Sequence, residues 1–337
     1  MAFDAATLFG YAIALLIVAG TVWWVLARWV PDGGATAPYA FSAYQAGLTR
    51  RETVPAVIVA SLIFVPVVTT WGDVVGLGWA LVGGLFIGGV YVGTVALAAR
   101  PRARFVDDAG GDPDTLTRDG PNVVAGSAAV PDGNAPLVAP VSEQPAVCYV
   151  ASIAQYQSQP FRNYGSFFIT SFDVRTRPFV VDGEFGRADV DPEGAWVSML
   201  SGSPTDVGSD LEDAFTGGPS EHEHVVEAGE VVPERFRDAT SVFGTLPLTD
   251  DGRTERELRF KETSITLGDD VVVAGEAETG DAFGSTVIRC DVPGGFVAKG
   301  SFERVSESLS ESTGRNLVIA SVATVLGGVG LLWLAIP

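Results

Sequence analysis

The chain has 337 residues, of which 47% are hydrophobic, and its mean hydropathy of +0.28 is too high for one soluble domain of this length. Its 41 acidic and 21 basic residues give a formal net charge of −20. This negative charge argues against nucleic acid as a partner, because binding to phosphates requires clustered Lys and Arg.

The charge is distributed unevenly along the chain and is poor in lysine. Residues 105–314 hold 37 of the 41 acids, and residues 1–104 hold the other four. Only Lys261 and Lys299 are lysines, and the other 19 bases are arginines. Acid-rich, lysine-poor surfaces are typical of proteins that stay soluble in multimolar salt, where the Debye length falls to about 3 Å or less. The composition therefore favours a halophilic archaeal source over an ordinary acidic protein.

Four uncharged apolar stretches are long enough to cross about 30 Å of hydrocarbon. They lie at 5–27, 53–72, 74–99 and 316–336. The first has an alternative interpretation as a signal peptide, but it lacks preceding basic residues and ends on Trp23, Trp24 and Arg28. This pattern favours a membrane anchor. We therefore expect three transmembrane helices within residues 1–104 and a fourth at the C-terminal end.

The arginines that flank these stretches all fall on one side of the bilayer. The positive-inside rule places that side in the cytoplasm. We expect a multi-pass protein of the cell membrane, with both termini outside and residues 105–314 in the cytoplasm. No stretch has an ionisable residue at its centre, which disfavours a transport component. The flanking arginines are Arg28, Arg50, Arg51, Arg100, Arg102, Arg104 and Arg315.

The third stretch contains two GxxxG pairs, at Gly84 and Gly88 and at Gly89 and Gly93. Such pairs let helix backbones approach each other closely. They predict either a dimer face or, as we favour, packing between helices of the same chain.

The remainder of the chain has the pattern of a β domain. Residues 105–135 have the composition of an acidic linker, with a weak strand at 122–126. Short apolar strands then follow to residue 300, interrupted by an acidic insertion at about 202–251 that has one helix near 233–239. Gly, Pro and Asp turns between short strands predict a small antiparallel barrel, since closure removes edge strands. Residues 301–313 predict a juxtamembrane helix that leads into the last span. The predicted strands are 146–153, 166–174, 178–181, 187–190, 195–200, 256–266, 271–274, 285–290 and 296–298.

Five short motifs follow one another within residues 136–310. They are APVS at 139–142 with PAVCY at 145–149, PFVVD at 178–182 with Gly186, DPEGA at 191–195, LGDDVVVAGEA at 267–277, and the segment 296–309. In order and spacing they resemble the GIDE domain of membrane-anchored mitochondrial E3 ubiquitin ligases and their prokaryotic relatives. The roles of the matching residues look structural, as turn formers and buried positions. These residues are Cys148, Tyr149, Pro178, Phe179, Asp182, Gly186, Asp191, Pro192, Glu193, Gly194, Gly268, Asp269 and Gly275.

The resemblance implies a membrane-surface interaction module more readily than a ligase. In the eukaryotic relatives the ligase activity resides in a RING, whose two zinc ions need eight Cys or His ligands. This chain has two Cys and two His. That inventory does not build a RING, so ubiquitin-ligase activity is kept as the alternative.

The sequence contains few candidates for chemistry. Cys148 and Cys290 pair in a disulfide or, as we favour in a reducing cytoplasm, stay free. His222 and His224, each preceded by a glutamate, would share one face of a strand and are weak candidates for a metal site, although a solvated loop is the plainer interpretation. There is no GxSxG, P-loop or GxGxxG motif. We expect no catalytic residue and no cofactor.

The predicted function is that of a membrane-anchored, GIDE-type interaction module that is not catalytic on its own. It would present a cytoplasmic β domain to a protein partner, or to copies of itself, at the lipid bilayer. The alternative is an enzyme of ligase type or a hydrolase, as the family name suggests.

Overall fold

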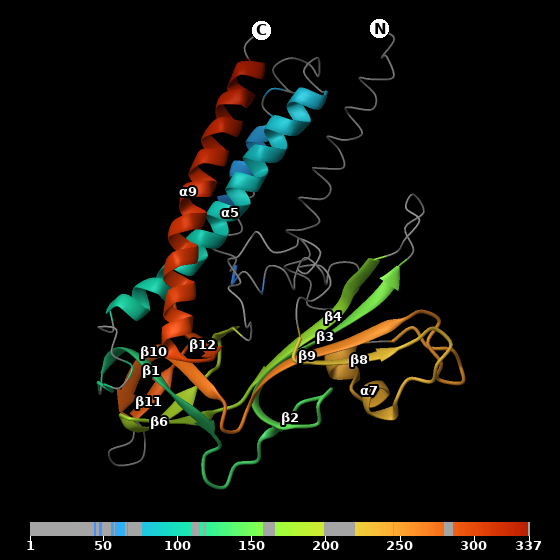
Figure 1. Cartoon of the computed structure of the whole chain (residues 1–337), viewed down its shortest axis with the longest axis vertical. Helices are drawn as coiled ribbons and strands as arrows, with labels where there is room; N and C mark the ends of the chain where they lie inside the picture. The colour runs from blue at the N-terminus through green and yellow to red at the C-terminus, as the bar shows by residue number, and fades with distance from the viewer. Residues whose placement is uncertain are drawn as a thin grey trace.

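The fold was analysed from a computed structural model, in which two long helices stand on a β unit made of a barrel and a second sheet (Figure 1). The structure describes residues 44, 47–48, 55–56, 58–64, 66, 76–108, 113, 115–117, 119–157, 166–198, 220–244, 246–279 and 286–335.

The two long helices are α5 (Leu77–Asp108) and α9 (Phe302–Ala335), which pack side by side (Figure 1). A Cβ added to Gly89 would lie 2.6 Å from the backbone nitrogen of Thr324, so this contact requires glycine. Gly93 on the next turn also faces α9. The second GxxxG pair therefore packs within the chain.

A short 3-10 turn, η1 (Ser61–Phe64), lies beside α5. The indole nitrogen of Trp79 donates a hydrogen bond of 3.0 Å to the carbonyl oxygen of Ile63, and both side chains are buried. This contact ties the segment before α5 to the first turns of that helix.

Five strands form a closed barrel in the spatial order β1, β5, β6, β11, β10. The barrel closes because β10 also pairs with β1. This is the connectivity of the five-stranded Greek-key barrel called the OB fold. Two further strands, β12 and β7, extend the sheet from β10. The strands are β1 (Gly120–Ala129), β5 (Phe179–Gly183), β6 (Gly186–Asp191), β7 (Trp196–Ser198), β10 (Asp270–Thr279), β11 (Thr286–Arg289) and β12 (Phe296–Lys299).

Strand β10 is buried on both of its faces. Val271 and Val273 fill the barrel interior, whereas Val272 and Ala274 pack with residues of α5 and α9 on the outside. All four side chains are fully buried. A strand covered on both faces has a continuous apolar run in place of alternation, which is the pattern of this segment.

The second sheet is inserted into two connections of the barrel, between β1 and β5 and between β6 and β10. Helices α7 (Glu234–Asp238) and α8 (Thr240–Phe243) pack against the sheet. Phe236 of α7 stacks on Phe260 at 4.1 Å. The strands of the second sheet are β2 (Leu137–Val138), β3 (Pro145–Gln157), β4 (Ser166–Thr176), β8 (His222–Val226) and β9 (Leu258–Thr266).

The prediction of four membrane spans is wrong. Within the described ranges, two helices are long and apolar enough to cross a membrane, at Gly78–Asp108 and Asn316–Leu334. In the described part of 53–72, residues 55–56, 58–60 and 66 are helical, and Ser61–Phe64 form the 3-10 turn η1, which departs from the α-helical hydrogen bonding of a straight span. The stretch 5–27 lies outside the described residues.

The predicted barrel is present, but it is not wholly antiparallel, because one strand pair of the barrel and one pair of its extension are parallel. β11 runs parallel to β6, and β12 runs parallel to β7. Hydrophobic alternation shows which face of a strand is buried, but it carries no information about the direction of its neighbour.

The positions of the strands agree better with the sequence. Each of the nine predicted strands overlaps an observed one, and the weak strand at 122–126 is the centre of β1, inside the segment assigned to a linker. The predicted juxtamembrane helix and the last apolar stretch form one continuous helix, α9. The insertion at 202–251 contains β8, α7 and α8 in its described part.

Candidate functional site

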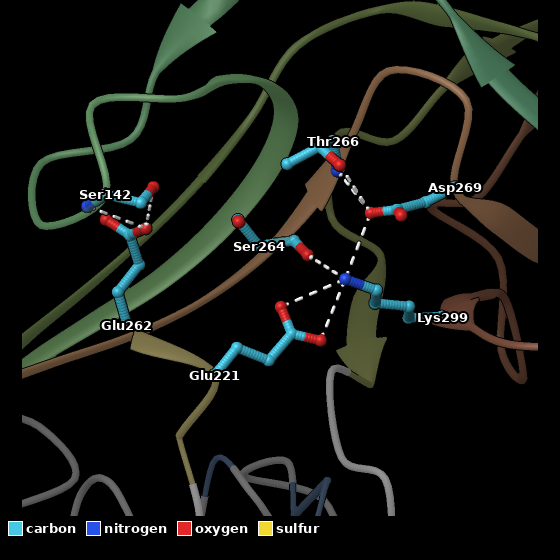
Figure 2. Close-up of polar contacts among 7 residues, drawn as sticks. All are labelled: Ser142, Glu221, Glu262, Ser264, Thr266, Asp269 and Lys299. Carbon is cyan, nitrogen blue, oxygen red and sulfur yellow. Dashed lines mark hydrogen bonds and ion pairs between the residues drawn. The ribbon is translucent and has the colours of Figure 1, made fainter. Parts of the chain in front are cut away.

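A polar cluster lies where the barrel meets the second sheet, and Lys299 is its centre (Figure 2). The ammonium group of Lys299, at the end of β12, lies 2.8 Å from a carboxylate oxygen of Glu221 and 3.0 Å from Oδ2 of Asp269. It also donates a hydrogen bond of 2.9 Å to the carbonyl oxygen of Ser264 on β9. Glu221 precedes β8, so this cluster connects three strands of two different sheets.

The electrostatics of the cluster favour the charged forms of Lys299 and Asp269. Partial burial disfavours charge on Lys299, but the hydrogen bonds that its ammonium group donates to Glu221 and Asp269 outweigh this effect and raise the pKa of the amine. Burial also acts against the carboxylate of Asp269, but the Thr266 backbone N–H and Lys299 outweigh it and lower its pKa. A protonated amine is not a nucleophile. The arrangement therefore acts as a tether between the sheets.

A buried carboxylate belongs to Glu262 on β9, and it holds the loop before β3 (Figure 2). One oxygen accepts a hydrogen bond of 2.6 Å from the backbone N–H of Val141. The other accepts one of 2.6 Å from the hydroxyl of Ser142. Because the residue is only 1% exposed, these donors compensate for the loss of water. The nearby hydroxyl of Ser264 is buried without a partner in the structure.

The two histidines lie on one face of β8, as expected for a strand with this spacing, and both are half-buried. His222 is opposite Glu262 in the β8–β9 register, and His224 is opposite Phe260. The ring of His224 packs against Phe236 with centroids 5.1 Å apart. Across the described ranges, no group of three or more His, Cys, Asp or Glu side chains is arranged to hold a metal ion. The ring of His224 therefore contributes to the packing of β8 against α7.

Cys148 and Cys290 are free and lie in the barrel core. Burial raises the pKa of both thiols, that of Cys290 to about 12. A thiol with such a pKa is protonated at neutral pH and does not act as a nucleophile.

A clasp of aromatic and basic residues joins α5 to the barrel extension. The guanidinium of Arg102 lies 4.0 Å above the ring of Trp196 on β7 and donates a 2.8 Å hydrogen bond to the carbonyl oxygen of Gly47. The indole nitrogen of Trp196 donates to the carbonyl oxygen of Tyr44 at 3.0 Å, and the Tyr44 hydroxyl donates to that of Val197. Residues far apart in the sequence are thus fixed together at the lower end of α5.

Several signature residues form turns, as their residue types predicted. Gly186, Gly194 and Gly268 have positive φ angles of 103°, 74° and 88°, which glycine adopts without strain. Asp191 Oδ1 accepts the backbone N–H of Glu193, which closes the turn that contains Pro192 and Gly194. Asp269 closes the β9–β10 turn by accepting hydrogen bonds from both the backbone and the hydroxyl of Thr266.

Other signature residues are buried or close to neighbouring backbone. Phe179 lies in the barrel core, and Tyr149 lies in the core of the second sheet. Gly275 passes so close to β11 that a Cβ would overlap the carbonyl oxygen of Arg289. Pro178 precedes β5, and exposed Asp182 lies within it, opposite Arg187 of β6.

The contacts of Lys299, of Glu262 and of the clasp were not predicted from the sequence. The only signal for Lys299 was its rarity, as one of two lysines in the chain. Comparisons of the chain with protein-family models, with curated proteins and with solved structures found no match.

Proposed function

We propose that the chain is a membrane-anchored interaction module that holds its β unit at the cytoplasmic surface and offers an open sheet edge to a protein partner. The observation that carries this proposal is the packing of the barrel directly beneath two long apolar helices. The GIDE-like motifs of the sequence support the same function.

The surface of α9 supports insertion of the two helices into a bilayer. Only 17% of the apolar stretch of α9 is buried, whereas the core helix of a soluble protein is mostly buried. Each large apolar side chain gains roughly 1.5–3 kcal/mol when it leaves water. Contact with the hydrocarbon of a bilayer would remove this apolar surface from water. The exposed apolar residues of α9 are Val318, Ile319, Val322, Val325, Leu326, Val329, Leu332 and Trp333.

The connections to the helices support a fixed position of the β unit. β12 ends at Lys299 and α9 begins at Phe302, so no flexible linker separates the barrel from the helix. The outer face of the barrel shares a core with both helices, through Val106 of α5 and Leu309 of α9. Arginines at the lower ends of the helices support a cytoplasmic position for this side.

The second sheet offers the surface for a partner. The barrel ring is closed, but in the described part of the chain β8 pairs with β9 alone. Val225 of β8 is 43% exposed. An open edge strand with an exposed apolar residue is a template for an added strand, which is a common mode of peptide recognition.

The test compares two matched substitutions in the full chain. Val225→Lys places on β8 the charge that natural edge strands use against pairing, and Leu267→Lys makes the same kind of change at an exposed turn residue. We expect a protein that co-purifies with the wild type and Leu267→Lys in mild detergent to be lost from Val225→Lys. Equal retention by all three, or purification of the wild type without a partner, overturns the proposed edge. Release of the chain from membranes by alkaline carbonate overturns the anchoring.

A further inference from the structure

The last turns of α5 have one face against the barrel and one face exposed. Phe105 and Val106 pack with the outer face of β10 and β12. Pro101 contacts the β11–β12 turn, where a Cβ on Gly294 would lie 2.7 Å from its carbonyl oxygen. Arg100 and Arg104 are both exposed on the rest of this surface. They are four residues apart, so their side chains lie on the same face of the helix.

Arg100 lies at the level where the apolar part of the helix pair ends. Gly93 of α5 contacts Ala320 of α9. At 1.5 Å per residue, Arg100 is about 10 Å below this contact, and the apolar stretch of α9 begins about 6 Å below it, at Asn316. The guanidinium groups thus occupy the depth of lipid headgroups in a bilayer that surrounds α5 and α9.

These two arginines lack a carboxylate partner among the residues that the structure describes, although acids outnumber bases two to one in the chain. Several arginines of the β unit have a carboxylate within 3.3 Å, for example Arg175, Arg253 and Arg289. Arg100 and Arg104 have no ion pair with any described residue. Exposed Asp107 and Asp108 follow one turn later, on the side away from the apolar stretch.

We propose that Arg100 and Arg104 together bind the phosphate of an anionic lipid headgroup in the leaflet next to the β unit. A guanidinium presents two parallel N–H groups to phosphate oxygens, and two guanidiniums on one helix face surround a single phosphate. The inference rests on the proposed function, because it requires that α5 spans the bilayer. The bound lipid would fix the depth of α5 and therefore the height of the barrel.

The experiment titrates phosphatidylglycerol, and in parallel phosphatidylcholine, into the detergent-solubilised full chain and measures bound lipid by native mass spectrometry. Each basic residue near an anionic lipid surface contributes about 1 kcal/mol. We therefore expect the double variant Arg100→Gln/Arg104→Gln to bind phosphatidylglycerol about 30-fold less tightly than the wild type. The matched control, Arg187→Gln/Arg237→Gln, removes two exposed arginines of the β unit and should bind like the wild type.

Three outcomes overturn the lipid site. They are equal binding of the two lipids, equal loss in the two double variants, and displacement of phosphatidylglycerol by millimolar inorganic phosphate, which would show a site for free anions. Flotation of the reconstituted wild type with vesicles separates this proposal from the proposed function. A chain that floats but does not select anionic lipid refutes the lipid site alone, whereas a chain that does not float refutes the membrane anchoring.

Discussion

Replacement of Lys299 by Met tests whether the cluster between barrel and sheet holds the two parts of the β unit together. Methionine keeps most of the apolar stem and removes the ammonium group. The variant loses the contacts to Glu221 and Asp269 and the hydrogen bond to the Ser264 carbonyl. It also leaves two carboxylates close together without a cation between them.

The loss of folding stability expected for Lys299→Met follows from the geometry and burial of these contacts. A hydrogen bond to a charged group contributes roughly 1.5–3 kcal/mol when it is shielded from water, and an exposed ion pair contributes about 0.2–1 kcal/mol. The Lys299 side chain is 23% exposed and has three partners, so we take about 2 kcal/mol for the whole substitution. In a unit of this size that corresponds to a decrease of about 4–8 °C in Tm.

The measurement is thermal unfolding in mild detergent, followed by intrinsic tryptophan fluorescence, with Arg289→Met as the matched control. Arg289 forms one ion pair with Glu278, and both side chains are more than half exposed. Its loss should change Tm by about 2 °C or less, because exposed pairs contribute little. Equal shifts in the two variants would refute the assignment of Lys299 as a tether.

The pH dependence of the same comparison has a definite sign. Folding raises the pKa of Lys299, so its contribution is present below the ordinary lysine value of about 10.4 and is lost as the pH rises through the folded value. Folding lowers the pKa of Asp269, so that contribution is present above about 3.9 and is lost as the pH falls through the folded value. The difference between wild type and Lys299→Met should therefore be largest between these limits.

Three further substitutions or reagents test other parts of the structure. Gly89→Leu should separate α5 from α9 and decrease Tm, whereas Gly88→Leu, at a position with open space around it, should leave Tm nearly unchanged; equal effects would refute the observed packing. Cys148 and Cys290 should resist a maleimide at pH 7 until denaturant is added, because both thiols are buried with raised pKa values; rapid labelling of the native chain would contradict their burial. Gly275→Val should decrease Tm strongly, because its side chain would overlap the backbone of β11, and retention of the wild-type Tm would exclude that close contact.

Local patterns in the sequence predicted the positions of most strands correctly, because a half-buried strand alternates between apolar and polar residues. Arg256 to Thr266 alternates between apolar and charged residues, and the structure buries Leu258 and Phe260 on one face of β9. The turns could also be predicted from residue type, since Gly and Asp at 268–269 have the composition that a tight turn requires.

The pairing of strands and the number of long helices could not be predicted from local sequence patterns. The closure of β1 on β10 joins residues about 150 positions apart, and no periodicity encodes such a contact. A window of apolar residues at 53–72 satisfied the composition of a span, but composition does not reveal the 3-10 turn at Ser61–Phe64 in the described part of that stretch.

The candidate sites depended even more on tertiary contacts. Glu221 and Lys299 are 78 residues apart, and their meeting follows from the way β8 and β12 enter different sheets. In a chain with 41 acids, no single carboxylate is distinctive before the fold brings it to a cation. Arg102 was identified only as a flanking charge, yet its contact with Trp196 depends on β7 being beside β12.

The burial of β10 on both faces opposes rotation of the β unit away from the two long helices. Rotation of the barrel away from α5 and α9 would expose Val272, Phe296 and Val106, which are now less than 10% exposed. Each of these side chains loses roughly 1.5–3 kcal/mol when it returns to water, so the sum far exceeds thermal energy. The tether at Lys299 then extends this rigidity from the barrel to the second sheet. A partner that binds at β8 would therefore meet an edge in a fixed position relative to α5 and α9, and in the proposed membrane-anchored arrangement this position sets the height of the edge above the bilayer.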